Sequence, residues 1–194
     1  MRITFWSPIH GQAAVTSNMM TVAFLAGTIH RKKSIITQTQ FINNNLEAPL
    51  VGSGLKNSNS EEFFQGTGID NLVRSFKAAP VSLTDVENCC ISFANTNVSL
   101  LPGTAKNNRS YFDNEMNQVI LRLLVQIDNL YDITFLDVNS GANPLSMEII
   151  RTSDLTVVNL PQNIHVVEEF LTMQRVLIKG EVFFLFGSYD NNSK

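Results

Sequence analysis

Cysteine is scarce in this 194-residue sequence, and its two cysteines, Cys89 and Cys90, are adjacent. Neighbouring cysteines rarely form a disulfide, and no cluster of cysteine and histidine supplies the ligands of a structural zinc site. The pair begins an apolar segment, which favours buried small side chains over redox groups. A reducing compartment is the simplest setting for such a chain, and we expect a cytoplasmic protein.

Charged residues are also sparse, at 16% of the chain, and 14 basic against 17 acidic residues leave a formal net charge of −3. This balance argues against a strongly basic groove, so we do not expect direct binding of nucleic acid. The apolar runs, such as residues 182–186, are far shorter than the roughly 20 residues that cross a bilayer. The sequence therefore predicts no membrane span.

Apolar residues make up 44% of the chain, enough for one buried core, and the length suits a single domain over residues 1–194. Short apolar segments that predict strands alternate with segments of helical composition. The predicted strands are residues 2–6, 33–37, 90–93, 98–101, 133–138, 155–160 and 181–186. The predicted helices are residues 17–25, 70–79, 112–129, 145–151 and 164–173, and residues 43–60 predict a loop.

Some of these segments carry finer predictions. Gly27 is expected to cap the C-terminus of the first helix, and Asp70 the N-terminus of the second. The phenylalanines of the last strand, Phe183, Phe184 and Phe186, are expected in the core of the sheet.

Strands without an alternation of apolar and polar residues are typical of parallel sheets that helices cover on both faces. Joined through helices, they predict an α/β fold with a doubly wound, mostly parallel sheet. Ligands bind such sheets at the carboxyl ends of the strands. The turn after Trp6, residues 7–18, and the turn that begins at Asp137 and runs through Asn139, Ser140 and Gly141 are therefore the candidate sites.

Two enzyme classes find no support in these turns. No glycine-x-serine-x-glycine elbow occurs, which removes the usual sign of a serine hydrolase. The first turn also lacks the glycine triplet of a dinucleotide-binding fold.

In residues 3–18, 132–145 and 153–160, taken in this order along the chain, the sequence resembles the ParA/MinD group of P-loop ATPases. Its character is similar to that of the atypical TadZ-like members, which help to position pilus or secretion machinery. The resemblance implies a P-loop NTPase-like domain. Family members usually continue past the last strand with further helices, which we expect this chain to lack.

The resemblance implies a nucleotide-binding turn and a magnesium site. The turn comprises nine residues: His10, Gly11, Gln12, Ala13, Ala14, Val15, Thr16, Ser17 and Asn18. Ser17 and Asp137 would hold magnesium, Asn139, Ser140 and Gly141 would form a switch-like loop, and Asn159 would lie near the base. Two of these residues have a plainer reading: Asp137 would cap the turn that follows it, and His10 would be an exposed histidine without a role.

The turn departs from the family pattern of lysine, two glycines, valine, glycine, lysine, threonine. With Ser17 laid on the magnesium-binding hydroxyl, the phosphate lysine falls on Thr16 and the first lysine on Gly11. No lysine or arginine occurs between Arg2 and Arg31. The second strand ends in residues 37–40, Thr-Gln-Thr-Gln, where the family has acidic residues that help to orient water. Loss of such a carboxylate costs about 10²–10⁴ in rate, so we expect no efficient hydrolysis of ATP.

Three functional hypotheses follow, and the lowest-ranked is a partition protein that binds DNA non-specifically. The first is a non-hydrolysing scaffold or localisation factor for a pilus, secretion or partition apparatus, with protein partners. The second is an active ATPase that binds magnesium-ATP at residues 10–18 and hydrolyses it in a dimer. ATP and magnesium are the cofactors that the resemblance implies, although the altered turn also allows that neither binds, and it further implies a homodimer that meets face to face across the turn.

Overall fold

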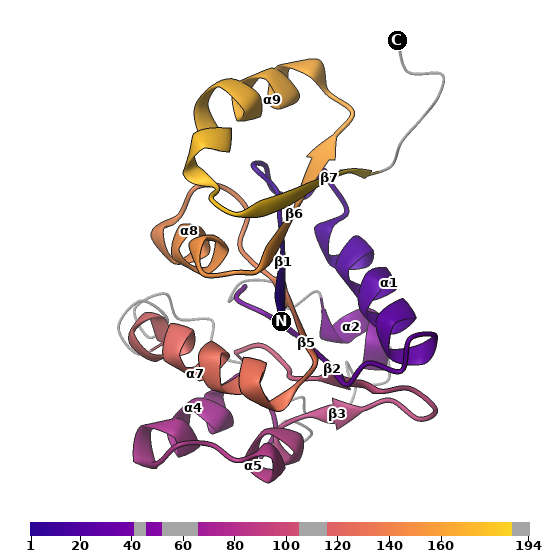
Figure 1. Ribbon diagram of the computed structural model, residues 1–194, viewed down its shortest axis with the longest axis vertical. Helices are drawn as coiled ribbons and strands as arrows, with labels where there is room; N and C mark the ends of the chain where they lie inside the picture. The colour runs from indigo at the N-terminus through magenta and orange to yellow at the C-terminus, as the bar shows by residue number, and fades with distance from the viewer. Residues whose placement is uncertain (41–45, 52–65, 105–115, 188–194) are drawn as a thin grey trace.

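The computed structural model describes residues 1–40, 46–51, 66–104 and 116–187. Seven strands form one sheet: β1 Arg2–Trp6, β2 Ser34–Gln38, β3 Ile91–Ser92, β4 Val98–Leu100, β5 Ile133–Asp137, β6 Leu155–Pro161 and β7 Glu181–Gly187. The described helices are α1 Val15–Thr28, α2 Glu47–Val51, α4 Ile69–Ala78, α5 Leu83–Asn88, α7 Asn117–Leu130, α8 Pro144–Arg151 and α9 Ile164–Glu169. Figure 1 shows the sheet running through the molecule with helices on both sides.

The strand order is β3-β4-β2-β5-β1-β6-β7. Every neighbouring pair is parallel except β3 and β4. The order of the strands across the sheet reverses at β1, which lies between β5 and β6. Because β1 is parallel to both, the carboxyl ends of these three strands lie at the same edge of the sheet. The predicted fold class, a doubly wound and mostly parallel α/β sheet, is confirmed.

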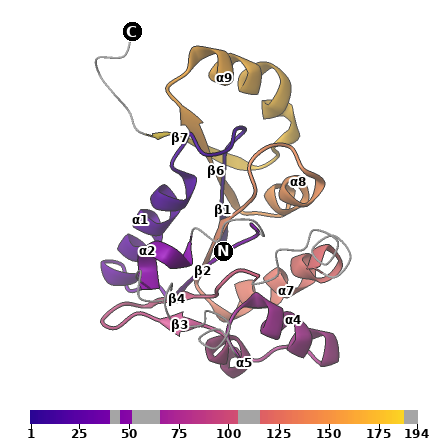
Figure 2. The same ribbon diagram turned by 180° about the vertical axis from the view of Figure 1, so that it is seen from behind.

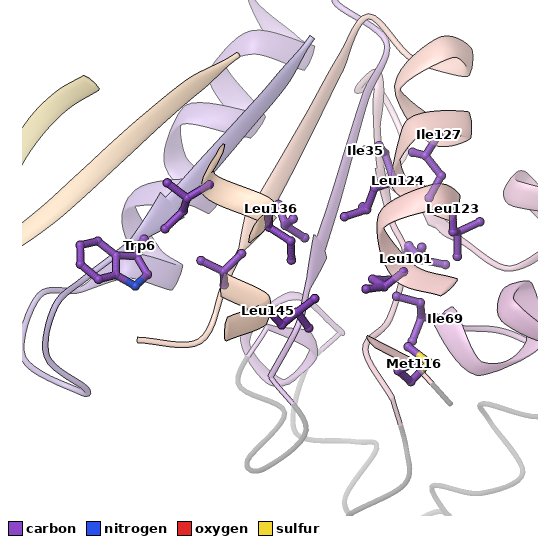
Figure 3. Packing of buried hydrophobic residues seen from close by; sticks show 14 of the residues in the cluster. Trp6, Ile35, Ile69, Leu101, Met116, Leu123, Leu124, Ile127, Leu136 and Leu145 are labelled. Carbon is purple, nitrogen blue, oxygen red and sulfur yellow. The ribbon is translucent and has the colours of Figure 1, made fainter. Parts of the chain in front are cut away.

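Two apolar layers hold the sheet between them, because successive residues of each strand point to opposite faces. Phe5 and Phe135 pack with Met19 and Ala23 of α1 on one face. Trp6 and Leu136 pack against α7, α8 and Phe170 on the other. Figure 2 shows α1 and α2 together on one side of the sheet and α4, α7 and α8 on the opposite side. Figure 3 shows the second layer, where Leu123, Leu124 and Ile127 of α7 lie beside Ile35 and Leu101.

Most predicted strands and helices lie within two residues of their expected bounds. The helix predicted from residue 112 begins, among the described residues, at Asn117, and residues 105–115 lie outside the described chain. Of the loop predicted over residues 43–60, the described part forms α2, so the prediction is wrong there. The last predicted helix is α9 followed by a π turn, Phe170–Gln174, and a 3-10 turn, Arg175–Leu177.

Both predicted caps are wrong. Gly68 takes the N-cap position of α4, and Asp70 lies inside its first turn. Gly27 lies within α1 rather than after it. A Cβ atom at position 27 would overlap Cγ2 of buried Val98, so the glycine allows α1 to lie close against β4.

The phenylalanines of β7 also differ from prediction, because β7 is an edge strand. Phe183, Phe184 and Phe186 are 57%, 47% and 45% exposed, although their strand was expected inside the sheet. An apolar run predicts a strand but does not say whether it lies in the middle of a sheet or at its edge.

Gly27→Ala is expected to destabilise the protein by up to about 2 kcal/mol. Alanine favours a helix by about 1 kcal/mol over glycine, but overpacking against the rigid, buried Val98 costs about 1–3 kcal/mol. Urea denaturation followed by circular dichroism measures the change. Thr21→Ala, at an exposed position of the same helix, is the control and is expected to change stability by less than about 0.5 kcal/mol. A stabilised Gly27→Ala variant would contradict the close packing.

Candidate nucleotide site at the carboxyl ends of the strands

The loop that joins β1 to α1, residues 7–14, passes over the carboxyl edge of the sheet. Gly11 has a φ of 75°, and Ala14, the N-cap residue of α1, has a φ of 50°. This left-handed conformation costs a residue with a Cβ atom roughly 1–2 kcal/mol, so contacts elsewhere hold Ala14 in place. No side chain caps α1, and its first backbone N–H groups lack an intrahelical partner.

A cavity of about 300 Å³ opens beside this helix N-terminus. Its lining residues are His10, Gly11, Ala13, Ala14, Val15, Thr16, Ser17, Met20, Gln40, Pro49 and Ser140. The structure thus brings together seven of the nine residues predicted for the turn, together with Ser140 from the turn after β5. No lysine or arginine of the described chain is among the lining residues, so His10 is the residue there that can carry a positive charge.

Asp137, at the end of the central strand β5, is fully buried beside this cavity. The Thr16 hydroxyl donates a hydrogen bond to its Oδ2 at 2.5 Å, and Nε2 of Gln40 donates to its Oδ1 at 3.4 Å. Its side chain does not cap the following turn: Asn139, which begins that turn, bonds instead to Thr39.

Burial raises the pKa of the Asp137 carboxyl from 3.8 to about 6, and the hydrogen bonds from Thr16 and Gln40 and the nearby His10 offset this rise only in part. Burial dominates because a charged carboxylate loses its hydration there, and no cationic side chain of the described chain forms an ion pair with it.

Two further predicted residues face each other below the loop. Nδ2 of Asn18 donates to Oδ1 of Asn159 at 2.8 Å. Asn159 is fully buried in β6, and its own Nδ2 donates to the carbonyl groups of Trp6 and Val157. Its amide therefore fixes the start of the loop from below and does not reach the cavity lining.

The turn after β5 is tied to the β1–α1 loop by backbone contacts at Gly141. Nε1 of Trp6 donates to the Gly141 carbonyl at 3.0 Å, and the Gly141 N–H donates to the Ser7 carbonyl at 3.0 Å. Gly141 has a φ of 79°, a conformation that glycine adopts without strain. The two turns therefore hold each other in position.

Three features of the site were missed in the sequence. Buried Glu47 accepts hydrogen bonds from Gln38 Nε2 at 2.9 Å and from the Gly103 N–H at 2.6 Å, yet it lies in the segment read as a loop. Gln40 contacts Asp137, and the sequence pattern of the second strand does not predict this contact. Gly187, at the end of β7, lies so close to the loop that a Cβ atom there would come within 2.7 Å of the Ala13 carbonyl carbon.

Magnesium fits this arrangement poorly. Ser17 is exposed, and the side chains that donate hydrogen bonds to Asp137 in the described chain are Thr16 and Gln40. The hydroxyl that does reach Asp137 belongs to Thr16. Both carboxylate oxygens are engaged and the residue has no exposed surface. Among the described residues no group of three or more acidic, histidine or cysteine side chains comes together to hold a metal. The donor types suit magnesium, but Asp137 is buried and is not among the residues that line the cavity.

The fold is a doubly wound, mostly parallel sheet, and the candidate site lies at the carboxyl ends of its strands. No protein-family model and no curated protein matches the chain, but solved structures do. A ParA family ATPase from Chlorobium tepidum superposes with a TM-score of 0.76 at 12% identity, over 98% of this chain and 75% of its own.

Two further groups of solved structures agree. A plasmid partition protein from Borrelia burgdorferi matches with a TM-score of 0.69 at 14% identity, over 99% of this chain and 80% of its own. Another partition protein structure from that organism was solved with AMPPNP. MinD from Pyrococcus horikoshii, solved with Mg-ADP, matches with a TM-score of 0.63 at 16% identity, over 95% and 68%. The chain therefore has a fold similar to that of ParA and MinD ATPases at low sequence identity. In the part of the chain that the structure describes, no helix is long and apolar enough to cross a membrane.

Asp137→Asn is expected to stabilise the protein at pH 7. Because the folded state holds the Asp137 proton more tightly than the unfolded state, the ionised form costs up to about 3 kcal/mol above pH 6 and nothing below pH 4. The free energy of unfolding of the variant should exceed that of the parent protein at pH 7, and the two should converge as the pH falls to 4. Urea denaturation across this range measures the difference, and a difference that stays constant with pH would contradict it.

The Thr16 hydroxyl provides the matched comparison. Thr16→Val removes a hydrogen bond that lowers the pKa of Asp137. The pH at which the free energy of unfolding stops falling should therefore move upward. Thr16→Ser keeps the hydroxyl and should leave this pH unchanged.

Proposed function

We propose that this chain is a ParA/MinD-like positioning or assembly factor that does not hydrolyse ATP efficiently. The observation that carries the proposal is the pairing of buried Asp137 with the Thr16 hydroxyl beside a cavity whose lining contains no lysine or arginine. In P-loop enzymes a cation and a magnesium ion stabilise the charge of the transferring phosphoryl group. The described lining of this cavity supplies no lysine or arginine as the cation.

The same contact supports a change in how the loop is aligned with the family pattern. In P-loop enzymes the loop hydroxyl and the strand-end aspartate surround the same magnesium ion. Thr16, rather than Ser17, is the residue beside Asp137. With Thr16 in the hydroxyl position, Gly11 falls on a glycine of the pattern, which agrees with its φ of 75°.

In this alignment Val15 takes the place of the phosphate lysine and His10 that of the first lysine. An apolar side chain at the first residue of α1 gives phosphate no charge to bind. Loss of preorganised charge of this kind removes several kcal/mol of stabilisation from the transition state. The alignment therefore supports the absence of efficient turnover as strongly as the earlier one did.

The second candidate, an ATPase of the ParA/MinD type that acts as a dimer, has an observation of its own. The uncapped N-terminus of a 14-residue helix faces the cavity, and such backbone N–H groups attract phosphate without any lysine. Structures of the same fold were solved with AMPPNP and with Mg-ADP. A partner subunit or another segment would then have to supply the missing cation.

The TadZ-like role in a pilus or secretion apparatus, and the alternative role in partition, remain parts of this proposal. Both use a P-loop fold as a platform for protein partners. The low charge of the chain favours protein surfaces over nucleic acid as the platform's target.

Phosphate release separates the two candidates. The purified chain with ATP and magnesium should release no phosphate above the buffer, because the site lacks the charges that stabilise the transition state. A colorimetric phosphate assay measures this, with Asp137→Ala as the matched control for contaminating ATPases. Turnover by the parent chain that disappears in Asp137→Ala would overturn the proposal and establish the second candidate.

Val15→Lys is expected to tighten the binding of ATP and ADP about 10- to 100-fold, because a hydrogen bond to a charged group contributes about 1.5–3 kcal/mol. Isothermal titration calorimetry measures the affinity. Ser17→Lys adds the same charge at the exposed residue two positions later and should have a smaller effect. If the two variants bind equally well, or if only Ser17→Lys gains affinity, the proposed alignment is incorrect.

A further inference from the structure

Among the described residues, strand β7 forms one edge of the sheet. All seven of its residues pair in parallel register with β6, from Glu181 beside Leu155 to Gly187 beside Pro161. No other strand of the described chain pairs with its outer side. Edge strands are normally protected by lysine, proline or a bulge. β7 contains no lysine or proline, and its charged residue, Glu181, stands at the first position.

The exposed side chains of this edge lie on both faces of the sheet. Phe183 is the neighbour of Val157, which belongs to the layer under α1. Phe184 is the neighbour of Val158, which belongs to the opposite layer, and its ring meets that of Phe170 at 5.9 Å. A partner that covers the edge must therefore offer apolar groups to both faces at once, as another β-strand does.

A second copy of β7 meets this requirement in the antiparallel direction. In an antiparallel pair, the side chains of directly opposed residues lie on the same face of the sheet. A twofold axis perpendicular to the sheet keeps each side chain on its face, so the axis must pass between a residue and its own copy, which lies directly opposite. Placed at Phe184, the axis pairs all seven residues of each strand. Phe184 then faces its own copy, Phe183 faces Leu185, and Val182 faces Phe186, so apolar residues meet on both faces.

The charges of the strand agree with this register. Glu181 faces Gly187 of the other copy, and the two Glu181 residues lie six positions apart, about 20 Å along the strand. This separation exceeds the screening length at physiological salt, so they do not repel each other appreciably. A parallel pairing in register would place the two carboxylates side by side.

The exposed area also suits such a contact. The exposed fractions of Phe183, Phe184 and Phe186 together correspond to on the order of 300 Å² of apolar surface in contact with solvent. A stable interface takes about 800 Å² from each partner. The rings alone supply more than a third of this, and the pairing of seven backbone residues adds to it.

We propose that β7 is a dimerisation edge, where two copies of this chain join into one continuous sheet through antiparallel pairing centred on Phe184. No residue of β7 is among those that line the cavity beside α1, and the pairing requires no nucleotide. The proposal goes beyond the proposed function and does not depend on it.

Sedimentation velocity of the 194-residue chain without nucleotide tests the pairing. The parent chain should be a dimer, and Phe183→Lys should raise the dissociation constant at least about 100-fold, because each dimer loses two aromatic contacts. Val125→Lys, at a position of α7 that is 54% exposed, is the control and should leave the dimer unchanged. Circular dichroism confirms that each variant is folded. A monomer at 100 µM, or a dimer that Phe183→Lys does not weaken, would overturn the proposal.

Cysteine cross-linking tests the register. Phe184→Cys brings two thiols together on the axis with Cα atoms about 4.5–5.5 Å apart, within the range of a disulfide. An oxidised dimer should therefore form on non-reducing gels. Val182→Cys, on the same strand and face, is the matched control, because its two copies lie about 13 Å apart. A cross-link in Val182→Cys, or none in Phe184→Cys while the chain sediments as a dimer, would exclude this register.

Discussion

The burial of the central strands on both faces is the constraint on which the site depends. β1 and β5 lie between two apolar layers, so the polar side chains at their carboxyl ends have little access to water. A buried polar group without a partner costs about 1–3 kcal/mol, and a buried charge costs more. The side chains at this edge therefore bond to one another: Thr16 with Asp137, Asn18 with Asn159, and Gln38 with Glu47.

These pairs explain how the site remains stable without lysine. A buried carboxylate usually needs a cation, and here Asp137 has a hydroxyl and an amide instead. The hydroxyl and the amide offset only part of the effect of burial, so the pKa of Asp137 rises to about 6. The residues around Asp137 are thus neutral donors, and they offset only part of the cost of burying its charge.

Much of the fold could be predicted because it depends on local patterns. The apolar strands and the periodicity of α7 specify a parallel sheet with helices on both faces, and the turns after Trp6 and Asp137 follow from that topology. Other features depend on contacts between distant residues. The sequence predicts Gly27 as a helix cap, and only the position of Val98 beside it in the fold shows why glycine is needed there. The proposed alignment of the loop rests on one hydrogen bond, from the Thr16 hydroxyl to Asp137. The exposure of Phe183 follows from the position of β7 at the edge of the sheet.

The free edge and the candidate site are joined by direct contacts. The ring of Phe184 packs on Phe170, and Phe170 packs on Trp6 at 6.1 Å. Trp6 in turn bonds to Gly141 in the turn after β5. At its end, β7 places Gly187 directly against Ala13 of the β1–α1 loop. If pairing at β7 shifts either contact, it changes the affinity of the loop for an anion, and by thermodynamic linkage an anion at the loop changes the affinity of the edge by the same factor. The proposed positioning role would then need no hydrolysis, because binding at the loop would itself control assembly.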